Sequence, residues 1–249
     1  MSPLDAVAVF AAGIAAGTIN TVVGSGTLVT FPVLLSVGYS PVTANVSNTV
    51  GLVPGAASGA YGYRRELRGQ RRRTVPLATA SVLGGLCGSV LLLSLPASAF
   101  KEIVPAFIVI ALVLILVQPR LSTAIERRRR PHGMAGPLTT AGVFATGIYG
   151  GYFGAAQGIM LLAILGLGLD EELQRTNALK VVLTGLVNLV AGIVFVIVAH
   201  IAWLAALLIA VGSTIGGVLG ARYGRRLPEP ALRAVIVVVG IVAIVRLLA

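Results

Sequence analysis

The chain has 249 residues, of which 57% are hydrophobic and only 11% charged, and its mean hydropathy is +0.97. An ordinary soluble domain carries roughly 25% charged residues, so this composition excludes a water-soluble fold. The formal net charge of +11 does not indicate nucleic-acid binding, because the basic residues form short clusters between apolar runs. The single cysteine excludes an intramolecular disulfide.

Long runs without a charged residue predict an all-α integral membrane protein. A helix needs about 20 apolar residues to cross a bilayer, and several of these runs are long enough for more than one crossing. About eight transmembrane helices fit the apolar runs, at residues 4–22, 43–63, 74–95, 102–118, 136–154, 177–198, 201–221 and 230–248.

A glycine-rich segment follows the first predicted crossing and contains Gly24, Ser25, Gly26 and Thr27. Glycine disfavours a regular helix, and the apolar stretch 23–35 is too short to span a bilayer. Within a membrane, irregular backbone is tolerated only where protein buries it or where it lines a cavity. The segment therefore predicts a broken or re-entrant element beside a binding site. The alternative is that its glycines only allow close helix packing.

Two asparagines, Asn45 and Asn48, stand three residues apart at the start of the next predicted helix. Residues with this spacing share one helix face. A free helix N-terminus carries partial positive charge and unpaired N–H groups, which favour anions. These side chains are therefore candidates for binding a solute.

The sequence repeats itself at a constant offset, which predicts two pseudo-symmetric four-helix units. Residues 132 apart match, as in Asn45 with Asn177 and Gly84 with Gly216. Nearer the start the offset becomes 134, which pairs Gly24 with Gly158. The predicted division is a first repeat at 1–119, a basic cytoplasmic linker at 120–133 and a second repeat at 134–249. Transporters are commonly built from such repeats, with the substrate site where they meet.

In the second half, a glycine-rich stretch containing Gln157 precedes the helix that carries Asn177 and Lys180. The repeat predicts that this polar face meets that of Asn45 and Asn48. A lysine inside a membrane indicates function by default. The alternative is that Lys180 extends to the lipid headgroups near Arg175.

The basic clusters at 64–73 and 127–130 mark cytoplasmic loops by the positive-inside rule. Eight crossings then leave Arg222, Arg225 and Arg226 on the opposite side, against the same rule. A second possibility is that 6–35 or 133–169 enters the membrane and returns on the same side. Both topologies stay open at this point.

Enzyme motifs are missing from the sequence. It contains no Gly-x-Ser-x-Gly elbow, no His-Glu-x-x-His pair and no Walker A motif. We therefore expect no catalytic residues, no metal site and no cofactor, and we do not expect ATP to drive transport within this chain.

The chain resembles the TauE/SafE family of membrane proteins, also called the sulfite exporter or TSUP family. The resemblance covers nearly the whole chain and is carried by the early Gly-x-Gly segment ending at 31–35, by Ala44 and Asn45, and by 166–170 before 176–180. It implies a multi-pass inner-membrane protein that moves sulfite, sulfonates, related organosulfur compounds or short carboxylates. Ser25 and Thr27 depart from the longer glycine run that is common in the family.

The expected function is secondary transport of a small anion, with the lipid bilayer and the anionic solute as partners and self-association into a homo-oligomer left open. The alternative function is a membrane scaffold or assembly partner without transport activity. The expected location is the inner membrane of a bacterial-type cell. Substrate, direction and coupling ion are not determined by the sequence.

Overall fold

The computed structural model of the protein describes residues 1–127, 136–169, 171–224, 234, 236–238 and 241. The described residues contain helices and no strand, as the all-α prediction requires. Most of the crossing predicted at 230–248 lies outside them, as do residues 128–133 of the predicted linker. The named helices are α1 (Pro3–Val22), α2 (Thr27–Ser36), α3 (Pro41–Gly62), α4 (Arg71–Ser94), α5 (Ala97–Arg127), α6 (Pro137–Tyr152), α7 (Gln157–Gly168), α8 (Leu173–Val198) and α9 (Trp203–Tyr223).

Local sequence signals start the first long helices. At α1, the Ser2 hydroxyl accepts a hydrogen bond from the Asp5 backbone N–H at 3.2 Å, and the Asp5 carboxylate accepts one from the Ser2 N–H at 2.7 Å. This reciprocal pair is a capping box. At α3, the Ser40 side chain caps the helix and Pro41 occupies its first turn, where proline is tolerated.

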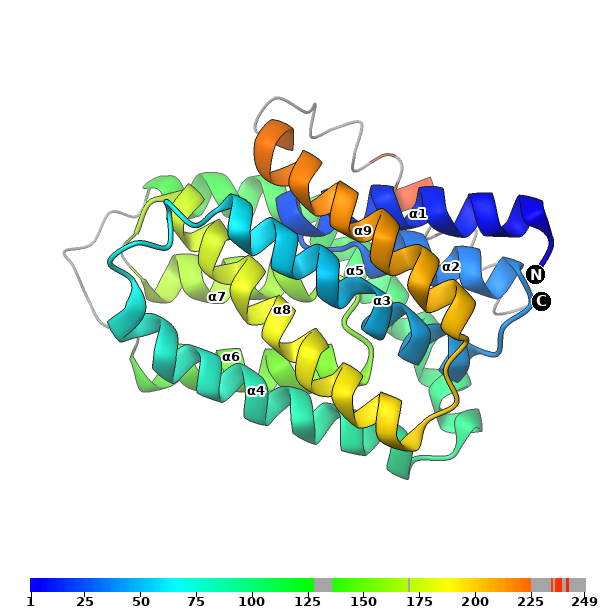
Figure 1. Cartoon of the computed structure of the whole chain (residues 1–249). Helices are drawn as coiled ribbons and strands as arrows, with labels where there is room; N and C mark the ends of the chain where they lie inside the picture. Colours follow the sequence, from blue (N-terminus) through cyan, green and yellow to red (C-terminus); the bar gives the residue numbers. More distant parts are fainter. Residues whose placement is uncertain (128–135, 170, 225–233, 235, 239–240, 242–249) are drawn as a thin grey trace.

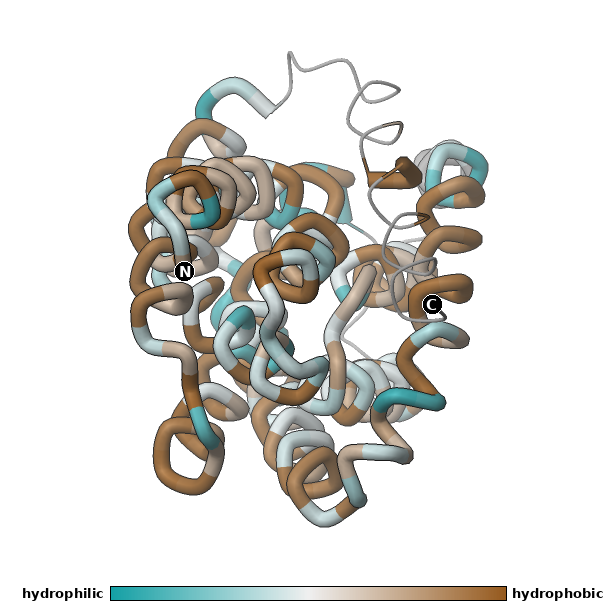
Figure 2. Tube along the Cα trace, turned by 90° about the vertical axis from the view of Figure 1, so that its right-hand side faces the viewer, coloured by the Kyte–Doolittle hydropathy of each residue, from teal (hydrophilic) through white to brown (hydrophobic). Residues whose placement is uncertain are grey.

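Figure 2 shows hydrophobic residues along most helices of the bundle, and many of their side chains are exposed on its outer surface. Large hydrophobic side chains that are exposed on it include Val109, Leu116, Ile197, Leu207 and Val211. Five helices are long and apolar enough to cross a membrane, namely α1, α4, the first 24 residues of α5, α8 and α9. Helix α3 has 22 residues and is also long enough, but its buried face carries Asn45, Ser47 and Asn48, which lower its hydropathy.

Helices α2 and α7 are too short to span a bilayer, with 10 and 12 residues against the roughly 20 required. Each follows a longer helix after a buried turn, at 23–26 and at 153–156. Gly26 already lies against Ala16 and Asn20 of α1, so α2 folds back along the helix before it. Figure 1 shows α2 and α7 toward opposite ends of the bundle. The segments 6–35 and 137–168 are therefore helical hairpins that enter from opposite ends and return.

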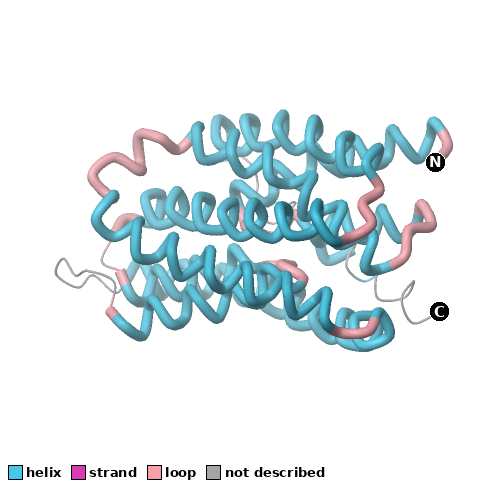
Figure 3. Tube along the Cα trace, turned by 60° about the horizontal axis from the view of Figure 1, so that its bottom comes forward, coloured by secondary structure: helices cyan, strands magenta, loops and turns pink. Residues whose placement is uncertain are grey.

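Most loops lie at the two ends of the bundle (Figure 3), and the basic loop at 64–73 shares one end with Arg175 and Arg222. Arg175 donates a hydrogen bond to the Arg68 carbonyl at 3.2 Å, and Gly62 packs against Ala221 beside Arg222. Arg222 therefore lies at the same end as the basic cluster at 64–73, which agrees with the second of the two topologies left open by the sequence. Each hairpin returns to the end of the bundle from which it entered, so the next helix starts at that same end. The hairpins therefore change the number of crossings.

Helix packing matches between the two halves, in a register that differs from the predicted one. Gly17 of α1 packs against Ser213 of α9, and Gly147 of α6 packs against Ser81 of α4. The offset is 132 between the serines but 130 between the glycines, where the sequence comparison predicted 134. Glycines recur every four residues in α1 and α6, so an alignment of the two halves by residue identity is easily shifted by four residues, which is about one helical turn. The division into two pseudo-symmetric repeats stays a prediction, and the two hairpins favour the returning topology over eight simple crossings.

Candidate functional site where the two hairpins meet

The turns of the two hairpins touch inside the bundle. The Gly158 backbone N–H donates a hydrogen bond to the Gly24 carbonyl at 3.0 Å. A Cβ atom on Gly24 would lie 2.5 Å from the Gly158 Cα, so only glycine allows this approach. Gly24 and Gly154, which are 130 residues apart, both have positive φ, at 92° and 76°. These left-handed residues reverse the chain at each turn.

Asn45 and Asn177 make equivalent contacts across the two halves. The Asn45 amide donates to the carbonyl of Tyr152, the last residue of α6, at 2.9 Å. The Asn177 amide donates to the carbonyl of Thr21, next to the end of α1, at 3.3 Å and to the Tyr63 hydroxyl at 3.1 Å. Carbonyls in the last turn of a helix lack an intrahelical donor. The two asparagines therefore stabilise the helix ends that precede the turns.

Asn48 has a different role from its predicted counterpart Lys180. Its amide nitrogen donates to the Thr27 hydroxyl at 3.2 Å, and its amide oxygen accepts a hydrogen bond from the Thr30 hydroxyl. Asn48 therefore connects α3 to the first turn of α2. Thr30 was not predicted from the sequence, although its spacing of three residues from Thr27 places both on one helix face.

Lys180 is fully buried, with 0% of its surface exposed. Its ammonium nitrogen lies 3.4 Å from the carbonyl oxygens of Thr21 and Val22, the last two residues of α1. The partial negative charge at a helix C-terminus stabilises a cation there. The side chain does not reach the headgroup region, so the snorkelling alternative is wrong. Arg175 occupies the end of the bundle instead, where it pairs with Glu171 at 2.5 Å.

Several polar atoms beside the meeting point have no hydrogen-bond partner among the described residues. They are the Ser25 hydroxyl, both amide atoms of Gln157, and the amide oxygens of Asn45 and Asn177. Ser25 and Gln157 are each 1% exposed. Buried polar side chains in proteins are generally hydrogen-bonded. These atoms are therefore the candidates for binding a polar solute.

Glycine and aromatic residues position this cluster. A Cβ atom on Gly150 would overlap the Gln157 amide, so Gln157 depends on the bare backbone of α6. Phe31 of α2 packs edge-on against Phe153 in the opposite turn, with ring centroids 5.2 Å apart. Phe100 contacts Phe153 as well, at 6.0 Å. The polar atoms thus adjoin an apolar wall, which limits the access of water.

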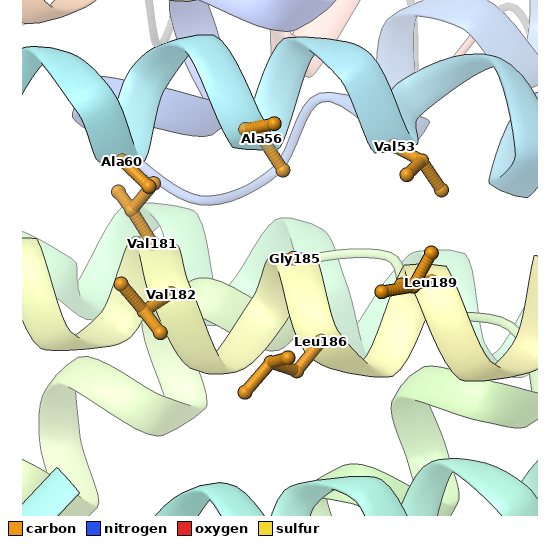
Figure 4. Close-up of a pocket in the computed structure, with 9 residues that line it drawn as sticks. Val53, Ala56, Ala60, Val181, Val182, Gly185, Leu186 and Leu189 are labelled. Atoms are coloured by element: carbon orange, nitrogen blue, oxygen red, sulfur yellow. The ribbon is translucent and has the colours of Figure 1, made fainter.

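Two apolar cavities lie elsewhere, along the groove between α3 and α8. One has a volume of about 190 Å³, and side chains of Val53, Ala56 and Ala60 face Val181 and Leu189 across it (Figure 4). The other, of about 320 Å³, continues along the same two helices. The polar residues predicted as a site do not line either cavity. Their apolar walls do not suit an anion.

The comparison with protein families gives a match that covers nearly the whole chain. The family model described as sulfite exporter TauE/SafE matches residues 9–247 of the chain. The chain belongs to the TauE/SafE family. It is thus a multi-pass membrane protein from a family of membrane transporters.

Individual relatives carry matching names. The probable membrane transporter protein YfcA, from Escherichia coli strain K12, is 26% identical over 249 residues, which covers 100% of this chain and 91% of the relative. The probable membrane transporter protein ORF9 of Sinorhizobium is 27% identical over 96% of this chain and 91% of its own length. A probable membrane transporter protein of Haemophilus influenzae is 27% identical over 92% and 89%.

Proposed function

We propose that this protein is a secondary transporter that carries a small anion across the inner membrane of a bacterial-type cell. The proposed substrate is sulfite, a sulfonate or a related organosulfur compound or short carboxylate. The observation that carries the proposal is the cluster of buried, unpartnered polar atoms at the meeting point of the hairpins, next to the buried Lys180. Membership of a transporter family supports it.

The start of α2 has the chemistry of an anion site. Among the described residues, the backbone N–H groups of Ser25, Gly26 and Thr27 have no backbone acceptor. The Ser25 hydroxyl adds a further donor, and the helix dipole favours negative charge at this end. At α7, by contrast, the Gly24 carbonyl already accepts the Gly158 N–H. We therefore propose that the anion binds at α2 rather than at α7.

The opposed hairpins also suit alternating access. Transporters commonly bind substrate near the middle of the membrane, at discontinuous helices of two repeats that move against each other. Here α2 leads from the meeting point toward one end of the bundle and α7 leads toward the other (Figure 1). Movement of one hairpin opens the site to its own end while the other hairpin keeps the second end closed. The basic end, with residues 64–73, is the proposed cytoplasmic end.

Anion uptake and binding test this proposal. Purified protein in proteoliposomes should take up at least one of sulfite, methanesulfonate and acetate, and the same anion should raise the melting temperature in detergent. Ser25→Ala should lower the affinity for that anion by about tenfold or more, because a hydrogen bond to a charged group contributes about 1.5–3 kcal/mol. Ser94→Ala is the matched control, since Ser94 is exposed and its hydroxyl donates to the Val90 carbonyl of its own helix.

Gln157→Leu should also weaken binding of the anion, while Gln174→Leu at the start of α8 should leave it unchanged. Absence of flux and of binding for every anion, together with a stoichiometric membrane-protein partner after purification in mild detergent, would overturn the proposal. That result would support the alternative of a scaffold or assembly partner.

A further inference from the structure

We propose that transport is coupled to protons and that Lys180 is the residue that carries the coupling proton. This inference rests on the proposed function and adds the coupling ion to it. Three observations support it: the place of the Lys180 amine, the groups that surround it and the use of lysine in this chain.

The Lys180 amine lies where a coupling cation would be expected to bind. Its nitrogen is 3.4 Å from the carbonyl oxygens of Thr21 and Val22, at the end of α1 and directly before the turn. In transporters with interrupted helices, carbonyls at such helix ends coordinate the coupling Na⁺ or H⁺. Here the chain supplies the cation itself, on a side chain that can bind and release a proton.

No carboxylate holds the charge of Lys180 in the described part of the chain. The described helices that pack against α8 contribute these other ionisable side chains: Asp5 from α1, Tyr61 from α3, Arg71, Arg72, Arg73 and Cys87 from α4, Lys101, Glu102 and Arg120 from α5, and Tyr149 and Tyr152 from α6. None of them bonds to Lys180. The Tyr63 hydroxyl, at the end of α3, reaches Asn177 three residues away. A bound anion would therefore be the first negative charge beside the amine.

The choice of lysine at this position is itself informative. The chain has 19 basic residues besides histidine, and only Lys101 and Lys180 are lysines. Arginine cannot be deprotonated in proteins, whereas a buried lysine exchanges its proton readily. Among the residues whose burial is described, arginine supplies nearly every exposed positive charge and lysine supplies the buried one, where a releasable proton is useful.

Proton and anion should bind together, since each favours the other by the same factor. A protonated Lys180 with a monovalent anion is neutral, and so is the empty site with an uncharged amine. Both forms can therefore complete the conformational cycle without moving net charge. The corresponding residue in the first half, Asn48, is not ionisable and is bonded to α2, so one proton accompanies each anion.

Proteoliposomes loaded at neutral pH test this inference with methanesulfonate, which stays a monovalent anion at every pH used. Acidic external buffer should drive accumulation of about tenfold per pH unit of gradient, whereas an imposed membrane potential should have no effect. Lys180→Arg should retain exchange of internal for external methanesulfonate but lose the response to the pH gradient, because its charge is permanent. Lys101→Met, at an exposed position on α5, should behave as the wild type.

A second measurement covers the case in which arginine does not fit the buried position. In weakly buffered, mildly alkaline detergent solution, the wild type should take up about one proton per methanesulfonate bound, and Lys180→Met should take up none. Uptake that ignores the pH gradient, or binding without proton uptake, would overturn the assignment of Lys180 while leaving anion transport intact. Absence of any methanesulfonate uptake or binding would instead overturn the proposed function for sulfonates, and this inference with it.

Discussion

Replacing Gly24 with alanine tests the contact between the two hairpins, on which the candidate site depends. Two properties of position 24 require glycine, namely its backbone conformation and its close approach to Gly158, and experiment can separate them. Its φ of 92° lies in the left-handed region, and an added Cβ would lie 2.5 Å from the Gly158 Cα. Gly38 has a similar φ of 98°, but an added Cβ there would meet nothing within 4 Å. Gly158 faces Gly24 without a positive φ.

The three positions predict different losses of unfolding free energy. Alanine in the left-handed region costs about 1–2 kcal/mol, which is the whole effect expected for Gly38→Ala. Overlap with a packed neighbour costs about 1–3 kcal/mol, which is the effect expected for Gly158→Ala. Gly24→Ala should show both and lose about 2–5 kcal/mol. Because the neighbour is backbone of the opposite hairpin, a side-chain rotation cannot relieve the overlap.

Melting temperatures of the purified variants in one detergent measure the order of these effects. A loss of 1 kcal/mol corresponds to roughly 2–4 °C for a chain of this size. We expect Gly24→Ala to be the least stable of the three and to reduce anion uptake more than Gly38→Ala does. Equal stability of Gly24→Ala and Gly38→Ala, together with an unchanged Gly158→Ala, would refute direct contact between the turns.

Two further predictions concern the basic end of the bundle. In a Cys87→Ala background, cysteines placed at Arg68 and at Arg222 should react with a membrane-impermeant maleimide from the same side of the membrane. A cysteine at Gly38 should react from the other side. Labelling of the Arg68 and Arg222 positions from opposite sides would contradict the hairpins. Glu171→Gln removes ion pairs to two partly exposed arginines, one at 2.7 Å and one at 2.5 Å. It should cost less than about 1 kcal/mol and lose its effect at high salt, as melting temperatures at low and high ionic strength will show.

Much of the candidate site was predictable from residue types alone. Glycines beside Ser25 and Thr27 indicated a broken helix, because glycine disfavours a helix and irregular backbone in a membrane has to be buried. The spacing of Asn45 and Asn48, and of Asn177 and Lys180, placed each pair on one helix face. Their use as ligands for a solute stays a prediction.

The partners of these residues could not be predicted. Asn48 bonds to Thr27 and Thr30 of its own half, whereas Lys180, its counterpart in the repeat, reaches across to α1 of the other half. Sequence spacing determines which face of a helix a residue shares. It does not determine which helix packs against that face.

The sequence by itself determined that this is a helical membrane protein, because the hydropathy of a run depends only on its own residues. It also located both interruptions, because glycine acts on the local backbone. Only the tertiary structure decided that each interruption is a turn back, since hydropathy does not record the direction of a helix. The Gly24 to Gly158 contact joins residues far apart in the chain and sets the turn that carries Ser25 beside the start of α7 at Gln157, while Lys180 meets the end of α1 directly before the first turn.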